Sequence, residues 1–333
     1  MKTILVTGAA GFIGSHLVEQ LDQLDEAELV LMDDMSLGKM ANLEEMIAKT
    51  SNTVHAKFGQ IEGNCSLMSV MRDVFSEFKP TTIYNLAVHP LPESLIDPLR
   101  VVDQNIAITL NIMECIRHAK TSARLVHISS SEVYGSMEEG DEIIEETHKL
   151  NPTTPYAASK ASCDLLCKSY VDTFGLDVVI ARPFNTFGPR QNDKSYAGIV
   201  PTTIKRIMRE KPPIITGTGN QTRDFMFVDD TVRGIIQVGK KGEKGEVYNI
   251  CTGEEKRILK IVKLISEMMG WDGGYEWHPD RSADVERHCG SFYKLAKLTE
   301  VNTGEIHKQR GWHPTISLEE GLAKTIDWYK HAG

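Results

Sequence analysis

The chain lacks a long hydrophobic run, a cysteine pattern typical of metal sites and a cluster of basic residues. Its N-terminus is only briefly apolar before glycines interrupt it, and no later run approaches the roughly 20 residues that cross a bilayer. The six cysteines are scattered, and Cys163 and Cys167 have no set of His or Cys partners beside them. We therefore expect a cytoplasmic protein without a membrane span or a bound metal, whose cysteines are reduced thiols.

Acidic residues outnumber lysine and arginine, which gives a formal net charge of -9 at pH 7. Nonspecific nucleic-acid binding needs clustered basic residues, so this charge argues against a nucleic-acid partner. A phosphorylated small molecule can still bind, because it needs only a few local positive groups. The length of 333 residues, with 41% hydrophobic and 25% charged, favours one large α/β domain with a smaller lobe.

Apolar or β-branched runs alternate with stretches of helical length from the N-terminus to about residue 130. The predicted strands are TILVT, ELVLMD, TVHAKF, TTIYNLA and RLVHIS, and the predicted helices include residues 13–23 and 101–118. A further predicted strand, DVVIARP, follows a helix that begins near Tyr156. This alternation is typical of a doubly wound parallel sheet with helices on both faces.

Proline and glycine become frequent after residue 185, and the predicted elements there are shorter. We therefore predict an α/β sheet domain over residues 1–185, with residues 225–250 returning to it. Residues 186–224 and 251–333 then form a smaller C-terminal α/β lobe.

Three glycines lie between the first predicted strand and the helix after it. Gly8 permits a tight turn, Gly11 lets the backbone approach a pyrophosphate, and Gly14 lets the helix pack on the strand. Turns collect glycine in any case, so the triplet alone is weak evidence. Asp33 ends the second predicted strand, where its carboxylate can accept hydrogen bonds from both ribose hydroxyls of an adenosine. Because a 2′-phosphate would meet this negative charge, the sequence favours NAD over NADP.

Tyr156 and Lys160 lie four residues apart on a predicted helix, so that the phenol and the ammonium share one helical face. A cation within about 4 to 6 Å can lower a pKa by roughly 1 to 3 units, which would make the tyrosine a usable base. Such pairs also occur on many solvated helices. The pair therefore indicates catalysis only together with the nucleotide site.

Seven segments of the chain occur in the order found in one enzyme family. They are TGAAGFIG, YNLA, SSSEVYG, YAASK, RPFNTFGPRQ, TRDFMFVDD and RSAD. In these segments the chain resembles the extended short-chain dehydrogenase/reductases that act on nucleotide sugars, over essentially its whole length. The resemblance implies a Rossmann-type domain with tightly bound NAD, a lobe that binds a nucleotide-diphosphate sugar, and a homodimer formed by paired helices.

The resemblance also implies roles for individual residues. Tyr156 is the base, Lys160 binds the nicotinamide ribose and lowers the pKa of Tyr156, and Ser130 hydrogen-bonds the C4 hydroxyl of the sugar. The resemblance assigns Asn185, Arg223 and Arg281 to the substrate diphosphate. It assigns Asp284 to the nucleotide ribose. Surface ion pairing is the alternative for both arginines.

The implied cofactor site extends beyond the glycine turn. Its expected residues are Gly8, Gly11, Phe12, Ile13, Gly14, Asp33, Gln60, Ile61, Leu86, Ala87, Asn105, Tyr156 and Lys160. Gln60 stands where the family often has an aspartate that reaches the adenine, and it can also bond an amino group. His89 lies in a proline-containing loop where many relatives carry glutamine, and it is either part of the sugar pocket or an ordinary loop histidine.

The common first step of these enzymes is oxidation at sugar C4, in which Tyr156 takes the C4 hydroxyl proton. Glu132 is the residue on which the next step depends. Epimerases generally have a small or hydroxyl residue at the matching position, whereas dehydratases and decarboxylases have glutamate. Many dehydratases also have an acid just before it, where this chain has Ser131, so Ser131 and Glu132 join the predicted catalytic residues.

Our leading hypothesis is a nucleotide-sugar 4,6-dehydratase with Glu132 as the base at C5. A 4-epimerase, acting for example on a UDP-hexose or UDP-hexuronate, is a close second, and a UDP-glucuronate decarboxylase is less favoured because QTRDF differs from the decarboxylase segment. A non-catalytic NAD-binding protein is a further alternative. Such proteins usually lack the tyrosine or the lysine, and both are present here.

Overall fold

The computed structural model describes residues 2–24, 27–119, 122–138, 140–192, 198–279, 285–300 and 311–331, which form two compact units. The first unit comprises Met1–Val133, Thr154–Arg182 and Val232–Tyr248. The second comprises Tyr134–Thr153, Pro183–Thr231 and Asn249–Gly333.

The first unit is built on a seven-stranded sheet in the order β10-β6-β5-β4-β1-β2-β3. Its strands are β1 (Lys2–Thr7), β2 (Ala27–Asp33), β3 (Val54–Phe58), β4 (Thr82–Asn85), β5 (Arg124–Ile128), β6 (Asp177–Pro183) and β10 (Val247–Ile250). The pairs of neighbours among β1 to β6 are parallel. Strand residues such as Leu5, Val30 and Leu125 are fully buried, as expected for strands covered on both faces.

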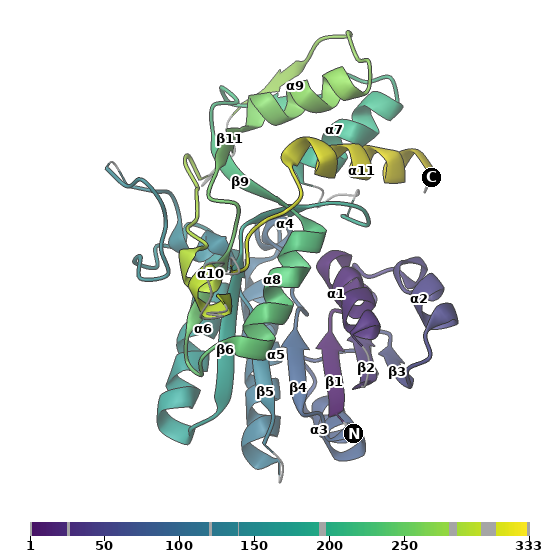
Figure 1. The fold of residues 1–333 in the computed structure, drawn as a ribbon, viewed down its shortest axis with the longest axis vertical. Coiled ribbons are helices and arrows are strands. Elements are labelled where there is room, and N and C mark those ends of the chain that lie inside the picture. The colour runs from purple at the N-terminus through teal and green to yellow at the C-terminus, as the bar shows by residue number, and fades with distance from the viewer. Residues whose placement is uncertain are drawn as a thin grey trace, which may run out of the picture. The chain divides into compact units, whose positions relative to one another are not determined.

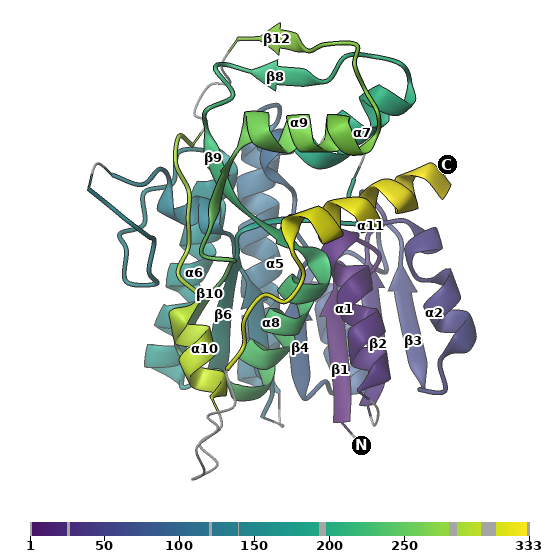
Figure 2. The same ribbon diagram turned by 45° about the horizontal axis from the view of Figure 1, so that its top comes forward.

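Helices cover both faces of this sheet. They are α1 (Phe12–Gln23), α2 (Glu44–Lys49), α3 (Met68–Phe78), α4 (Leu91–Ser94), α5 (Pro98–His118), α6 (Pro155–Phe174) and α8 (Val228–Lys241), with short 3-10 turns η1 (Met40–Asn42) and η2 (Ser131–Tyr134). Figures 1 and 2 show α1 and α8 on one face of the sheet and α5 on the other. Helices α5 and α6 pack against each other. The predicted doubly wound sheet is therefore confirmed, with strand boundaries within two residues of those expected.

Local sequence explains where the two long helices begin. The Asp97 side chain accepts the Arg100 backbone N–H at the start of α5, and Thr154 accepts that of Ala157 at the start of α6. Each cap is followed by a proline, whose missing N–H has no partner to lose in the first turn. Gly175 ends α6 in the left-handed region, at φ 70°.

The second unit contains two small sheets and four helices among its described residues. The sheets are β11-β9-β7, with β7 (Asn185–Phe187), β9 (Thr222–Phe227) and β11 (Glu255–Arg257), and β12-β8, with β8 (Ile214–Thr216) and β12 (Glu276–His278). The helices are α7 (Ile199–Met208), α9 (Ile258–Met268), α10 (Tyr293–Thr299) and α11 (Leu318–His331). Helix α7 packs against α9, and α11 contacts both.

The two units divide the chain differently from the expected boundaries, because the first unit takes back Val232–Tyr248 in place of the expected 225–250 and lacks a segment before α6. Residues 134–153 belong to the second unit, although they lie between two segments of the first. The backbone N–H of Met137 bonds to the carbonyl of Arg287, and that of Ile144 bonds to the carbonyl of Cys289. These hydrogen bonds join residues about 150 positions apart in the chain, so no local pattern in the sequence predicts them.

None of the helices in the described part of the chain is both long enough and apolar enough to cross a membrane. The six cysteines are buried free thiols.

Candidate active site

The candidate site lies at the carboxyl ends of neighbouring parallel strands, where doubly wound sheets bind their ligands. Gly8 follows β1, Asp33 ends β2, and Leu86 and Ala87 follow β4. Ser130 follows β5. The sheet order places β1 between β2 and β4, and β5 beside β4, so the structure brings these predicted residues to one edge of the first unit.

The glycine turn is too tight for side chains at two positions. Gly8 has φ +69°, and a Cβ there would lie 2.8 Å from the backbone nitrogen of Ala87. A Cβ on Gly14 would overlap the carbonyl oxygen of Gly8 and lie 2.9 Å from its carbonyl carbon. Gly11 is the N-cap of α1, and Phe12 and Ile13 form the first turn of that helix. Because glycine has no side chain to cap the helix, the turn presents backbone N–H groups to an anion.

Asp33 is fixed beside this turn. Its Oδ2 accepts the Ala10 N–H at 2.9 Å, and its Oδ1 accepts the Met35 N–H at 2.8 Å. Burial raises the pKa of Asp33, and the hydrogen bonds from Met35 and Ala10 oppose that rise. A Cβ on Gly38 would lie 2.6 Å from Oδ1, so the carboxylate is enclosed as well as bonded. The geometry holds a hydrogen-bond acceptor in one orientation at the end of β2.

Asn105 cross-links the loop after β4 to α6. Its Oδ1 accepts the His89 N–H at 2.8 Å, and its Nδ2 donates to the His89 carbonyl at 3.1 Å and to the Ser159 hydroxyl at 3.0 Å. The His89 Nδ1 lies 3.2 Å from Oε2 of the buried Glu93, which also pairs with Arg100. Burial and the charge of Arg100 lower the pKa of His89. His89 therefore anchors the loop as a neutral imidazole.

The predicted adenine-side residues follow β3. The Gln60 Nε2 donates to the Asp34 carbonyl at 3.0 Å, and the Ile61 side chain is 72% exposed. Their proposed contact with a cofactor stays a prediction.

Tyr156 and Lys160 lie in the first two turns of α6. The buried Lys160 Nζ donates to the Ile128 carbonyl at the end of β5, at 2.7 Å. An ammonium has three N–H donors, so two remain for a ligand. Burial lowers the pKa of Lys160.

Ser130 and Glu132 lie beside the Tyr156 phenol. Burial raises the pKa of Tyr156 to about 12, a hydrogen bond with Ser130 lowers it, and the charge of Glu132 raises it. Burial thus raises the pKa of Tyr156, whereas the sequence led us to expect that Lys160 lowers it. The role of Lys160 at a cofactor ribose stays a prediction.

The short turn η2 sets the position of Glu132. The Ser130 Oγ accepts the Glu132 N–H at 3.2 Å, which closes the turn. The Glu132 side chain is half-buried, and Ser131 is 3% exposed. The structure thus brings Ser130, Glu132 and Tyr156 together and leaves Ser131 within the protein interior.

The predicted substrate-binding residues lie in the second unit. Asn185 is the first residue of β7, and its buried Nδ2 makes no hydrogen bond within the described part of the chain. Arg223 on β9 is buried, and its Nη1 donates to the carbonyls of Thr222 and Val285. Arg281 and Asp284 lie outside the described residues. The Asn185 amide is therefore a donor that a ligand can satisfy.

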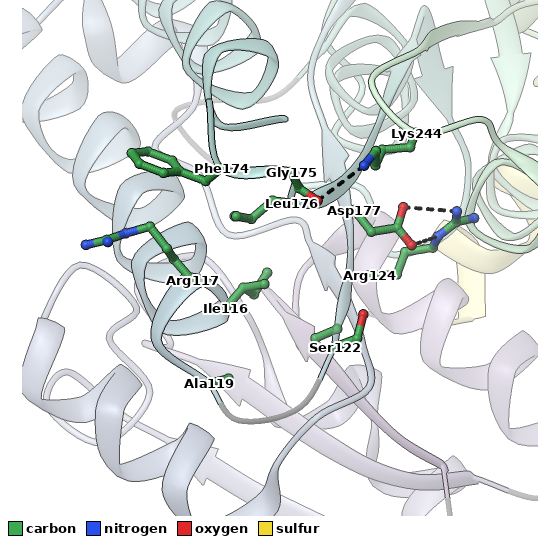
Figure 3. Close-up of a pocket in the computed structure, with 11 residues that line it drawn as sticks. Ile116, Arg117, Ala119, Ser122, Arg124, Phe174, Gly175, Leu176, Asp177 and Lys244 are labelled. Atoms are coloured by element: carbon green, nitrogen blue, oxygen red, sulfur yellow. Dashed lines mark hydrogen bonds and ion pairs between the residues drawn. The ribbon is translucent and has the colours of Figure 1, made fainter. Parts of the chain in front are cut away.

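Two cavities in the first unit lie away from this site. One, of about 570 Å³, is at the amino ends of β5 and β6, which Arg124 and Asp177 begin. Figure 3 shows Arg124 paired with Asp177 at 2.9 and 3.0 Å, and Lys244 directed to the Gly175 carbonyl at 3.3 Å. The other is lined by residues of α3 and α5. Neither cavity belongs to the carboxyl edge of the sheet.

Sequence reasoning missed a buried group of charged residues next to Lys160. His127, Asp164 and Arg182 are each at most 4% exposed. The only signal in the sequence was that Asp164 lies four residues after Lys160 on the same helix.

Comparisons with known proteins agree with the fold. The family model described as GDP-mannose 4,6 dehydratase matches residues 5–325. A dTDP-glucose 4,6-dehydratase from Neisseria gonorrhoeae is 31% identical over 98% of this chain and 95% of its own. A UDP-glucose 4-epimerase from Mycolicibacterium smegmatis is 32% identical over 99% of both chains.

Solved structures show the same two groups of relatives. A UDP-glucose 4-epimerase from Thermotoga maritima, crystallised with UDP-glucose, has a TM-score of 0.87 at 29% identity and 99% coverage of both chains. A dTDP-glucose 4,6-dehydratase from Streptomyces venezuelae, with NAD and TYD bound, has a TM-score of 0.87 at 28% identity, covering 98% of this chain and 97% of that one. The chain therefore belongs to the GDP-mannose 4,6 dehydratase family, within the extended short-chain dehydrogenase/reductases of the nucleotide-sugar epimerase and dehydratase group.

Proposed function

We propose that the protein binds NAD and a nucleotide-diphosphate sugar and catalyses 4,6-dehydration, which yields a 4-keto-6-deoxy sugar nucleotide. The observation that carries this proposal is the carboxylate of Glu132 beside the phenol of Tyr156. Epimerisation at C4 needs one group that moves a proton, whereas dehydration needs a second base for C5. The dehydratases among the relatives support the same reaction.

The residues of the first unit fit NAD. Gly8 and Gly14 leave room only for backbone, the start of α1 offers N–H groups to a pyrophosphate, and Asp33 offers a fixed acceptor to a ribose. Bound NAD supplies the acceptor for hydride from sugar C4 and later returns that hydride. The two remaining donors of Lys160 suit the hydroxyls of a ribose.

Tyr156 moves the first proton in this proposal. Its phenolate accepts the proton of the C4 hydroxyl as hydride leaves C4, while Ser130 donates a hydrogen bond to the reacting oxygen. With a pKa of about 12, the tyrosine holds its proton in the ligand-free protein. The proposal therefore requires that the phenolate forms within the complex with cofactor and substrate.

Glu132 moves the second proton. The 4-ketone acidifies the C5 hydrogen, Glu132 removes it, and the C6 hydroxyl leaves as water. Many dehydratases assist this departure with an acid at the position of Ser131, and the burial of Ser131 makes its hydroxyl a poor substitute. We propose that Glu132 both removes the C5 proton and delivers it to the leaving C6 hydroxyl, which departs as water. Hydride then returns to C6, and Glu132 passes a proton taken up from solvent to C5, which completes the 4-keto-6-deoxy product.

A nucleotide-sugar 4-epimerase is the second candidate. It is supported by the absence of an acid at Ser131 and by the similarity to the Mycolicibacterium epimerase over 99% of both chains. In this reaction Tyr156 and Ser130 keep their roles and Glu132 moves no proton. A UDP-glucuronate decarboxylase is a third, less favoured candidate.

The substrate contacts proposed for the second unit involve the diphosphate. We assign Asn185, Arg223 and Arg281 to it, and Asp284 to the nucleotide ribose. The buried, unbonded Nδ2 of Asn185 supports this assignment, because a buried amide donor is normally satisfied.

We also infer a homodimer and a cytoplasmic location. Leu95, Ile96 and Leu99, near the start of α5, and Leu165 on α6 are between 56% and 81% exposed. Helices α5 and α6 pack against each other, and large exposed apolar side chains on such neighbouring segments are typical of an interface. The six free thiols support a reducing compartment.

The test is to incubate the purified protein with UDP-, GDP-, dTDP- and CDP-sugars and to follow product mass. Loss of the mass of water indicates dehydration, and loss of carbon dioxide indicates decarboxylation. Unchanged mass with inverted C4 indicates epimerisation and would overturn the leading proposal.

The Glu132→Gln variant separates dehydration from epimerisation further. It should still oxidise C4 and should lose the exchange of C5 hydrogen for solvent deuterium. Glu138→Gln, in an exposed position six residues later, is the matched control and should behave as the wild type. Undiminished C5 exchange in the Glu132→Gln variant would refute the role of Glu132.

A further inference from the structure

Four ionisable residues, His127, Lys160, Asp164 and Arg182, form a buried cluster that includes Lys160 of the candidate site. The four side chains come from β5, α6 and β6, and each residue is between 0% and 4% exposed. Only Lys160 has a part in the proposed reaction. Since an ion in the interior is stable only with partners, the other three require an explanation.

Asp164 is the acid of this cluster. Its Oδ2 accepts a hydrogen bond from Nε of Arg182 at 2.9 Å. Its Oδ1 lies 3.7 Å from Nε2 of His127. Lys160 lies four residues earlier on α6, so the two side chains share one face of the helix.

His127 contributes a hydrogen-bond donor and no positive charge. Thr7 donates to Oδ1 of Asn85 at 2.8 Å, which turns the amide Nδ2 of Asn85 toward Nδ1 of His127, at 3.5 Å. Nδ1 is then the acceptor, and the proton is on Nε2, which faces Asp164. Burial and the charges of Lys160 and Arg182 hold the pKa of His127 well below its usual value. The imidazole is neutral, and the cations of the cluster are Lys160 and Arg182.

Lys160 therefore depends on Asp164 for electrostatic compensation. The Lys160 ammonium donates to a neutral carbonyl, that of Ile128. Burial lowers the pKa of Lys160, and negative charge on its own helix opposes this. Burial also raises the pKa values of Cys163 and Cys167, so both are neutral thiols near pH 7. Burial raises the pKa of Asp164 as well, and the charge of Arg182, a Ser129 hydrogen bond and the charge of Lys160 oppose that rise. Because Arg182 bonds the carboxylate directly, Asp164 is the source of negative charge on that helix face.

We propose that Asp164 is a positioning residue that keeps Lys160 protonated, so that the ammonium can bind the cofactor ribose and support Tyr156. Arg182 in turn holds the Asp164 carboxylate in place. This inference rests on the proposed function, because it takes Lys160 to be a cofactor-binding residue. It predicts that Lys160 loses its proton at a lower pH when Asp164 is neutral.

The test measures the dissociation constant for NADH by fluorescence, from about pH 6 to about pH 10. In the wild type, affinity should weaken as pH rises through the pKa of Lys160, and Lys160→Met should abolish this transition. In Asp164→Asn the midpoint should fall by about one pH unit or more. Asp164→Glu, which keeps the charge, should stay near the wild-type midpoint. Asp172→Asn, at an exposed position on the same helix, is the matched control and should not shift it.

A second variant covers the case in which Asp164→Asn does not fold, because it leaves Arg182 buried and unpaired. The double variant Asp164→Asn with Arg182→Gln removes both charges of the pair. Its midpoint should also fall, because the double variant still lacks the Asp164 carboxylate, whose charge opposes the effect of burial on the pKa of Lys160. The groups that face Lys160 and are held constant in this comparison are Tyr156, Cys163 and Cys167 of α6 and His127 of β5.

Each outcome bears on the proposal. An unchanged midpoint in a folded Asp164→Asn or double variant would overturn the positioning role. A lowered midpoint would support it, even if the wild type converts no sugar in the panel, a result that would count against the proposed reaction alone. Failure of the wild type to bind NADH would overturn both proposals.

Discussion

Two single substitutions in the turn between β1 and α1 should have different effects, one on the stability of the fold and the other on cofactor binding. In Gly14→Ala, the added Cβ would overlap the carbonyl oxygen of Gly8 and lie 2.9 Å from its carbon. Both atoms are backbone, so the start of α1 must move away from β1. Overpacking of this kind costs about 1 to 3 kcal/mol of unfolding free energy. At about 2 to 4 °C per kcal/mol for a domain of this size, the melting temperature should fall by several degrees.

Gly11→Ala is the matched comparison. Its Cβ would meet the Gly8 oxygen at 3.2 Å, and its φ of -73° suits any residue. The lower unfolded-state entropy of alanine favours this change by about 0.4 to 1 kcal/mol, and the 3.2 Å contact and the preference for glycine over alanine at an N-cap oppose it. The new methyl group projects at the N-terminus of α1, where a pyrophosphate must approach. We therefore expect a nearly unchanged melting temperature and a dissociation constant for NADH raised about tenfold or more, or about 1.4 kcal/mol.

Differential scanning calorimetry and NADH fluorescence titration on the same preparations measure the two effects. A Gly14→Ala variant that melts with the wild type would refute the packing argument. Full NADH affinity in Gly11→Ala would refute the assignment of this turn to the pyrophosphate.

Three further predictions concern other groups of the site and the fold. Tyr156→Phe should lower turnover by about 10²- to 10⁴-fold, the usual loss for a general base, with NADH affinity retained; turnover near the wild-type rate would show another base at C4. Asp33→Asn should weaken NADH binding by about 1.5 to 3 kcal/mol and reduce the preference for NADH over NADPH, as measured by titration with each cofactor. An unchanged ratio of the two dissociation constants in the variant would contradict the assignment of Asp33 to the ribose. Burial raises the pKa of Asp224 to about 6, above its unfolded value of 3.8, so its ionisation disfavours the folded state. Unfolding free energy should then fall as pH rises from about 4 to about 6, by up to about 3 kcal/mol, and urea titrations should find this slope missing in Asp224→Asn.

Much of the fold follows from local patterns in the chain. The apolar runs of the first unit formed strands because they are buried on both sides, and the helix expected to begin near Tyr156 is α6, which begins at Pro155. The roles of Gly8 and Gly14 in the turn were also readable, since only backbone fits at both positions. These features depend on spacing over a few residues, which sequence shows directly.

The remaining features depend on contacts between distant residues. Residues 134–153 join the second unit through backbone bonds to residues near 287 and 289, which no local periodicity predicts. From the sequence alone, Asp164 would be predicted to be a solvent-exposed helical carboxylate, because its partner Arg182 lies on β6. The direction of the Tyr156 pKa shift was wrong for a related reason, because helical spacing locates Lys160 but does not reveal how deeply the phenol is buried.

The cross-link made by Asn105 has a consequence for the entropy of ligand binding. Loops that lack regular structure usually lose conformational freedom when a ligand orders them, at about 1 to 2 kcal/mol per residue. The His89 amide and carbonyl are already bonded to Asn105, which is bonded in turn to Ser159 of α6. The loop after β4 that contains His89 is thus ordered before any ligand binds. Ligand binding therefore does not carry the entropic cost of ordering this loop. Its His89 amide should accordingly exchange with deuterated solvent as slowly as amides in the neighbouring helices.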